Sequence, residues 1–197
     1  MPRAGLNRAE VVRAAADLAD EAGYPNLTLD AVASRLGVRT PSLYKHIGGL
    51  PDLRREIAAL ALRELDSGAR DAMHGLSDAA ALRAFAGAYR AYIVAHPGRY
   101  ASTVGLTFTG RDDPLLASSQ RVAASIEAVL RGYRIAPADL PHALRTLRSA
   151  LHGYASLLTS DSFQWAADPA QSFEWMIDFI DRGLRTYAAA EATAAPR

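Results

Sequence analysis

Hydrophobic residues recur at helical spacing from the start of the chain. Val11, Ala15 and Leu18 fall three or four positions apart, so they share one face of a helix. Asn7 precedes this face and is a preferred N-cap residue, while Gly23 follows it and is typical of a helix end. The pattern therefore predicts a first helix between these two residues.

Shorter helices are expected in the next part of the chain. Thr28 and two prolines mark their starts, and glycines mark the ends of the first two. The expected segments are 28–36, 41–47 and 51–66, the last of which runs to Asp66 or beyond. Two short helices around a glycine-containing turn are the layout of a helix-turn-helix, whose later helix enters the major groove of DNA.

The helices expected after residue 77 are longer, and prolines or aspartates again mark most of their starts. Their segments are 77–96, 99–108, 113–133, 137–158 and 168–187, with a polar loop over 110–114 and a frayed tail over 188–197. No segment alternates apolar and polar residues as a half-buried strand would. The fold class predicted is all-α, a three-helix helix-turn-helix module followed by a larger helical domain.

The helix pattern breaks near 73–77, which predicts a domain boundary there. We expect a DNA-binding domain over 1–50, a connecting helix over 51–72, a ligand-binding and dimerisation domain over 73–189 and a tail over 190–197.

Composition excludes several classes of protein. Half of the 197 residues are hydrophobic, which is enough to bury a core, and there is no cysteine for disulfides, thiolate metal sites or thiol chemistry. No stretch has the length and apolarity of a signal peptide or a membrane span, so we expect a soluble, cytoplasmic protein without a membrane partner. The formal net charge is only +1, so any affinity for DNA has to come from local placement of charge.

The segment around the third helix is more polar than a core helix requires. Only Leu43 and Ile47 are clearly apolar there. One interpretation is a solvated surface helix, and basic and acidic residues are nearly balanced over 1–50. Position favours DNA, because basic side chains lie at the third helix while most of the acids fall on the first.

The stretches LTLDAVA (27–33) and LGVRTPSLYKHI (36–47), followed by Leu53, resemble the DNA-binding module of the TetR family of bacterial transcriptional regulators. Ile47 replaces the usual Phe, and Leu50 stands where many relatives have a phosphate-contacting Lys. The resemblance implies a double-stranded DNA operator as partner, with Tyr44 and Thr28 on phosphates. The implied DNA-binding residues are Thr28, Arg39, Thr40, Pro41, Ser42, Tyr44, Lys45 and His46.

The second domain resembles a TetR subfamily that carries a Trp-His-Gly motif. Here the step reads Leu151-His152-Gly153, with leucine in place of the tryptophan. The resemblance implies a helical ligand domain whose last two long helices pair with a second subunit. Leucines and isoleucines of these helices are the expected dimer contacts, although the same residues could fill an ordinary core: Leu144, Leu147, Leu151, Leu158, Ile177, Ile180 and Leu184.

A small-molecule effector is the other partner that the resemblance implies. Aromatic residues and one histidine could line an apolar pocket for it, and each could equally be plain core: Tyr89, Tyr92, Phe108, Tyr133, His152 and Tyr154.

The sequence carries no catalytic signature. There is no nucleophile elbow, phosphate loop or HExxH pattern, and no two histidines stand three or four residues apart as a helical metal site would need. We therefore expect no enzyme activity, catalytic residue, metal or cofactor.

The function expected is that of a homodimeric repressor that a small apolar or amphipathic molecule releases from DNA. A tilt of the helix 51–66 would change the separation of the two recognition helices, which must stay near one DNA turn, roughly 34 to 36 Å. The alternative is a helical small-molecule-binding protein or enzyme with a vestigial helix-turn-helix. Repressor and activator, and the operator, effector and regulated genes, are not distinguished by the sequence.

Overall fold

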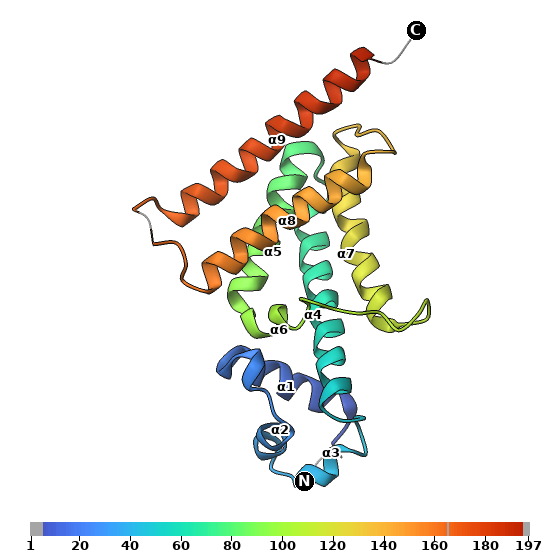
Figure 1. Cartoon of the computed structure of the whole chain (residues 1–197), viewed down its shortest axis with the longest axis vertical. Coiled ribbons are helices and arrows are strands. Elements are labelled where there is room, and N and C mark those ends of the chain that lie inside the picture. The colour runs from blue at the N-terminus through green and yellow to red at the C-terminus, as the bar shows by residue number, and fades with distance from the viewer. Residues whose placement is uncertain (1–5, 165, 195–197) are drawn as a thin grey trace. The chain divides into compact units, whose positions relative to one another are not determined.

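The computed structural model describes residues 6–164 and 166–194, and these are helical throughout apart from turns and loops (Figure 1). This confirms the all-α prediction. The helices are α1 (Arg8–Ala22), η1 (Tyr24–Asn26), α2 (Leu29–Leu36), α3 (Thr40–Leu43), α4 (Leu50–Met73), α5 (Asp78–Ala95), α6 (Pro97–Ala101), α7 (Pro114–Arg131), α8 (Leu140–Thr159) and α9 (Pro169–Ala194). In these ranges no helix is long and apolar enough to cross a membrane.

The predicted caps of the first two helices are confirmed. Asn7 accepts a hydrogen bond from the Glu10 N–H at 3.0 Å, and the Glu10 carboxylate accepts one from the Asn7 N–H at 2.9 Å. These two bonds form the capping box, which satisfies amides that would otherwise lack partners. The end of α2 is set by Gly37, whose φ of 66° lies in the left-handed region that favours glycine.

Several helix boundaries differ from the prediction. The third helix is regular only over Thr40–Leu43, and turns carry the chain on to the glycine pair before α4. Helix α6 spans Pro97–Ala101 and so shares only residues 99–101 with the expected 99–108 segment. Residues 188–194, predicted as tail, continue α9, because this alanine-rich stretch has high helix propensity. The rest of the predicted tail, 195–197, lies outside the described residues.

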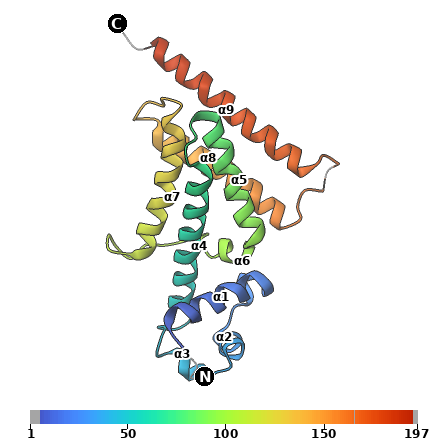
Figure 2. The same cartoon turned by 180° about the vertical axis from the view of Figure 1, so that it is seen from behind.

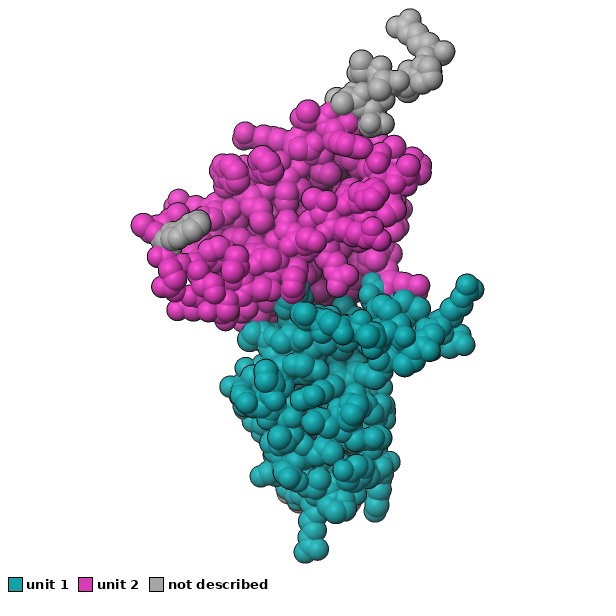
Figure 3. Space-filling model, viewed as in Figure 1, with its two compact units in different colours: residues 1–64, 95–119 teal, residues 65–94, 120–197 magenta. Residues whose placement is uncertain are grey.

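The chain forms two compact units that do not follow sequence order (Figure 3). Unit 1 comprises residues 1–64 and 95–119, and unit 2 comprises 65–94 and 120–197. The predicted boundaries near 50 and 73 therefore differ from this division, and α4 contributes to both units. Residues 95–119 join unit 1 because α6 packs against α1.

The contact between α6 and α1 needs a glycine and an arginine. A Cβ on Gly98 would lie 1.9 Å from the Ala19 carbonyl oxygen, so only glycine permits this approach. The next residue, Arg99, is 9% exposed and pairs with the carboxylates of Asp17, Asp20 and Glu64. Both residues fix α6 onto the module that also contains α2 and α3.

Unit 2 has its own apolar core. Its α5, α7, α8 and α9 contribute large side chains that are almost fully buried: Leu82, Phe85, Ile93, Ile126, Leu130, Leu147, Leu151 and Ile177. Helix α9 lies at the edge of this unit with α8 as its neighbour, as the view from behind also shows (Figure 2). Three of the predicted dimer contacts thus belong to the core.

Candidate nucleic-acid interface

The turn between α2 and α3 fixes the direction of the third helix. The Val38 N–H donates to the Ala33 carbonyl at 3.0 Å, which closes α2 around Gly37. On the inner side, Val32, Leu43 and Ile47 are buried in the core that α1 and α4 complete. The opposite side of α3 and its following turn consequently faces away from the core.

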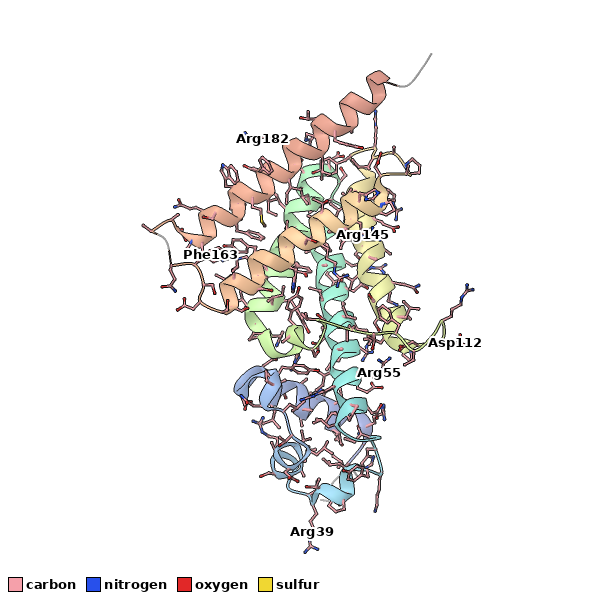
Figure 4. All side chains as sticks on the ribbon, in the orientation of Figure 1. Arg39, Arg55, Asp112, Arg145, Phe163 and Arg182 are labelled. Carbon is pink, nitrogen blue, oxygen red and sulfur yellow. The ribbon has the colours of Figure 1, made fainter. Side chains whose placement is uncertain are left out.

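Most of the predicted DNA-binding side chains lie on this outer side. The Tyr44 side chain is 60% exposed although its ring is large and apolar. The others are exposed or half-buried: Thr28, Arg39, Thr40, Pro41, Ser42, Lys45 and His46. Figure 4 shows Arg39, the N-cap residue of α3, pointing away from the helices of unit 1. The structure therefore brings residues 39–46 onto one continuous element, α3 with its flanking turns, whereas Thr28 lies at the start of α2.

Two threonines on this surface already have hydrogen bonds within the protein. The Thr28 hydroxyl accepts the Ala31 N–H at 3.2 Å and so caps α2. The Thr40 hydroxyl donates to the Asp30 carboxylate at 2.6 Å. Asp30 was not among the predicted site residues, because its pairing with Thr40 depends on how α2 and α3 cross.

Arg8 holds the end of the α3 segment against the start of α4. Its guanidinium donates to the His46 carbonyl at 2.8 Å, to the Asp52 carboxylate at 3.0 Å and to Glu56 at 2.8 Å. The hydrogen bonds that Arg8 donates to Glu56 and Asp52 raise the pKa of Arg8 above its ordinary value. Arg8 is a positioning residue that sequence analysis missed, since its partners stand far away in the sequence.

Asp52 also receives the Gly48 N–H at 2.7 Å. Burial alone would raise the pKa of Asp52, but the bonds from Gly48 and Arg8 outweigh it and lower that pKa. The neighbouring Leu50 is half-buried and packs against the core of α1 to α4. This position thus serves packing and presents no cation.

The predicted effector residues are divided between the two units. Phe108 is 45% exposed and belongs to unit 1, whereas the other five belong to unit 2. Tyr89, Tyr133 and Tyr154 are buried, and Tyr92 and His152 are half-buried. Two of the hydroxyls are engaged, since Tyr133 donates to Asp181 at 2.6 Å and Tyr154 donates to the Pro169 carbonyl.

The predicted dimer contacts divide into two groups. Leu147, Leu151 and Ile177 are each 1% exposed within the single chain, where they pack in the core of unit 2. Helical spacing gives the same signal for a core face and an interface face, so the sequence pattern does not separate the two. The remaining four are half-buried: Leu144, Leu158, Ile180 and Leu184.

Helices α8 and α9 also expose apolar surface that the prediction did not include. Trp175 is 69% exposed and Phe179 63%, and their rings stack with centroids 5.4 Å apart. Beside them lies a groove of about 480 Å³, with Ile180, Leu184 and Tyr187 among its lining residues. Exposed apolar side chains that gather in this way can mark a surface for contact with a partner.

The described residues contain no group of three or more His, Asp or Glu side chains placed to hold a metal ion. The chemistry available at the α3 surface is hydrogen bonding and ion pairing with an external partner.

Comparison with known families matches both parts of the chain. Residues 11–49 match the family described as "Bacterial regulatory proteins, tetR family", and residues 82–180 match "Tetracyclin repressor-like, C-terminal domain". The HTH-type transcriptional regulator YobS of Bacillus subtilis is 31% identical over 93% of this chain and 95% of its own length. The HTH-type transcriptional regulator Rv0681 of Mycobacterium tuberculosis is 34% identical over 78% of this chain and 71% of its own.

Solved structures share the fold. The putative regulatory protein SCO4313 superposes with a TM-score of 0.68 at 26% identity, covering 88% of this chain and 94% of its own. Apo ActR from Streptomyces coelicolor gives a TM-score of 0.71 at 17% identity over 95% of this chain and 99% of its own. BioQ, solved with its double-stranded DNA operator, gives 0.65 at 22% identity over 92% of this chain and 99% of its own.

Proposed function

Because the chain belongs to the TetR family of DNA-binding transcriptional regulators, a family of non-enzymes, we propose that it is a homodimeric repressor released by a small molecule. The observation that carries the proposal is the outer surface of α3. A tyrosine that is 60% exposed stands there among basic and hydroxyl side chains, on a helix whose inner side is anchored in the core. Such a surface suits phosphates and base edges.

The DNA-binding residues divide by the chemistry that they offer. Tyr44 and Thr28 carry hydroxyls that can donate to phosphate oxygens, and such contacts position the protein without reading sequence. Arg39 and Lys45 are exposed cations at the start and end of the α3 segment, where they can reach acceptors on guanine. Ser42 lies between them, and Pro41 and His46 complete the surface. Arg8 keeps this segment in place from within the protein.

The proposed dimer forms through the exposed apolar face of α8 and α9. Trp175 and Phe179 supply its aromatic centre, and the half-buried Ile180 and Leu184 line the adjoining groove. A second copy of this chain is the expected occupant, because helix-turn-helix proteins read two half-sites through a two-fold dimer. Leu144 and Leu158 on α8 extend the same interface in this proposal.

The proposed effector is a small apolar or amphipathic molecule that binds in unit 2. Tyr92 and His152, both half-buried, are its first candidates, and the motif around His152 is the one that resembles the Trp-His-Gly subfamily. Tyr89, Tyr133 and Tyr154 would contribute ring surface, whereas Phe108 belongs to unit 1. Helix α4 contributes residues to both units, which makes its tilt the proposed route from effector to DNA. The protein would act in the cytoplasm, where it meets DNA.

The alternative is a helical small-molecule-binding protein whose helix-turn-helix no longer acts on DNA. It is favoured by Leu50, which fills the core where many relatives have a cation.

A gel shift with DNA from upstream of the protein's own gene separates the two functions. The repressor is expected to retard this DNA and not a scrambled duplex at the same salt concentration. A library of small apolar molecules screened on the complex should then contain one that releases the DNA. Equal retardation of both duplexes, or none, would favour the alternative.

A further inference from the structure

We propose that Asp30 and Thr40 act as a paired acceptor that selects an exposed amino group, on cytosine or adenine, at one position of each operator half-site. This inference rests on the proposed DNA-binding function and names a specificity determinant within it. Its basis is the hydrogen bond of 2.6 Å that Thr40 donates to Asp30.

The two residues come from different helices of the helix-turn-helix. Asp30 lies in the first turn of α2 and is exposed, while Thr40 is the first residue of α3 and is half-buried. Thr40 follows Arg39, which points away from the helices of unit 1 (Figure 4). The pair therefore stands at the start of the helix that is proposed to enter the major groove.

The hydrogen bond decides which groups the pair can offer to DNA. A threonine hydroxyl has one proton, and here that proton is directed at Asp30. The Thr40 oxygen then presents only lone pairs, and an ionised carboxylate also only accepts. Both side chains consequently require a hydrogen-bond donor from any partner.

Each base pair offers one hydrogen-bond donor in the major groove, and the strand that carries it depends on the sequence. Cytosine presents its N4 amino group and adenine its N6 amino group, whereas guanine and thymine present O6, N7 and O4 acceptors. Phosphates are acceptors with a negative charge, so they would repel Asp30. An acceptor pair at this place therefore favours cytosine or adenine on the strand that it faces and disfavours guanine and thymine there.

Asp30 lies in the first turn of α2, where the helix dipole favours a carboxylate. Among the described residues it takes part in no salt bridge, although basic side chains stand on the same surface. A carboxylate beside a phosphate-binding surface weakens binding to every sequence unless a base donor meets it. The benefit of retaining it is discrimination between bases.

The competing explanation is that the bond only holds α3 against α2. In that case Asp30 would affect stability and general DNA affinity and leave the order of preferred bases unchanged.

The test is selection of bound duplexes from a randomised double-stranded DNA library, with the full-length protein and its variants. Wild type should enrich cytosine or adenine at one position per half-site. Asp30→Asn, whose amide can donate as well as accept, should reduce the discrimination against guanine or thymine there by roughly tenfold, while other positions keep their preferences. Thr40→Val should weaken the preference without changing the favoured base, and Thr40→Ser, which keeps the hydroxyl, should preserve it.

Asp112→Asn is the matched control, since it removes the same charge from an exposed loop residue of unit 1 that lies away from Arg39 (Figure 4). It should leave every preference unchanged. The inference is overturned if Asp30→Asn binds all duplexes more tightly by one common factor with the base order intact. Failure of wild type to enrich any sequence would instead overturn the proposed function itself.

Discussion

Tyr44 and Thr28 are both exposed residues of the DNA-binding surface, but they differ in what they do for the fold. Tyr44 leaves most of its ring in solvent, while Thr28 caps α2 through the Ala31 N–H. Removal of the Tyr44 hydroxyl therefore tests DNA binding alone. Removal of the Thr28 hydroxyl tests binding and helix stability together.

Tyr44→Phe should weaken binding to operator and random DNA by the same factor, because a phosphate contact carries no base information. Its melting temperature should equal that of wild type. Thr28→Ala should also lower the free energy of unfolding by about 1 kcal/mol, as loss of an N-cap does. Fluorescence anisotropy on both duplexes and thermal denaturation measure these effects.

The cationic residues Arg39 and Lys45 should differ from Tyr44 and Thr28, because they are proposed to contact bases and not phosphates. Lys45→Ala and Arg39→Ala should change which bases are preferred, at about 1 to 3 kcal/mol if a bidentate base contact is lost. Equal losses on operator and random DNA for these two variants would contradict their base-reading role.

Gly98→Ala should destabilise unit 1 by about 3 kcal/mol, because the added methyl group would overlap the Ala19 carbonyl and force α6 off α1. Gly87→Ala in α5 is the control, since a Cβ there would meet no described atom within 4 Å. The free energy of unfolding of this control should rise by up to about 1 kcal/mol, because alanine has a better helix propensity than glycine. Chemical denaturation of both variants gives the comparison, and unchanged stability of Gly98→Ala would show that α6 does not pack this closely.

At the scale of elements, Asp113 and Arg55 fasten the loop before α7 to α4 within unit 1. Asp113 accepts the Thr109 N–H at 2.9 Å, the Leu115 N–H at 2.9 Å and a bond from Arg55. The Thr109 N–H, followed by Arg55, outweighs burial and holds the pKa of Asp113 well below its ordinary value. The ionised carboxylate therefore stabilises the folded state.

Asp113→Asn should lower the melting temperature at neutral pH. The difference in melting temperature between wild type and variant should depend on pH. A lowered folded-state pKa gives stability that is complete above the unfolded pKa, about 3.9, and is lost progressively as the pH falls below it. The gap between wild type and variant should thus be constant from pH 7 to about pH 5 and narrow below about pH 4. Asp112→Asn should show no such gap. A gap for Asp113→Asn that is equal at pH 7 and pH 3 would contradict the assignment.

The sequence predicted elements better than the contacts between them. Capping residues and glycines predicted where α1 and α2 begin and end, because Asn7, Thr28 and Gly37 act on their immediate neighbours in the chain. The bonds of Arg8 to His46 and of Arg99 to Glu64 join residues far apart in the chain, so no local pattern encodes them. Core and interface leucines of α8 were not separable for the same reason.

At the scale of the whole molecule, the exposed face of α8 and α9 determines how the proposed dimer is tested. Phe179 is 63% exposed and Leu151 is 1% exposed. A charge at Phe179 can be solvated in a monomer, whereas a charge at Leu151 would be buried without a partner at a cost of several kcal/mol. A charge at Phe179 therefore tests dimer assembly, whereas a charge at Leu151 tests folding of the single chain.

Phe179→Asp should yield a folded monomer that has lost specific DNA binding, and Leu151→Asp should fail to fold. Light scattering gives the mass, and circular dichroism gives the helix content. A Phe179→Asp protein that remains dimeric would exclude this face as the interface.

The most direct test of the central claim is sedimentation analysis of the protein with labelled DNA from upstream of its own gene, beside a scrambled duplex. The account predicts two chains on each specific duplex at a salt concentration where the scrambled duplex stays free. Phe179→Asp and Tyr44→Phe should each reduce this complex, the first through assembly and the second through phosphate contact. A single chain per duplex with no preference between the two DNAs, or no complex at all, would contradict the account.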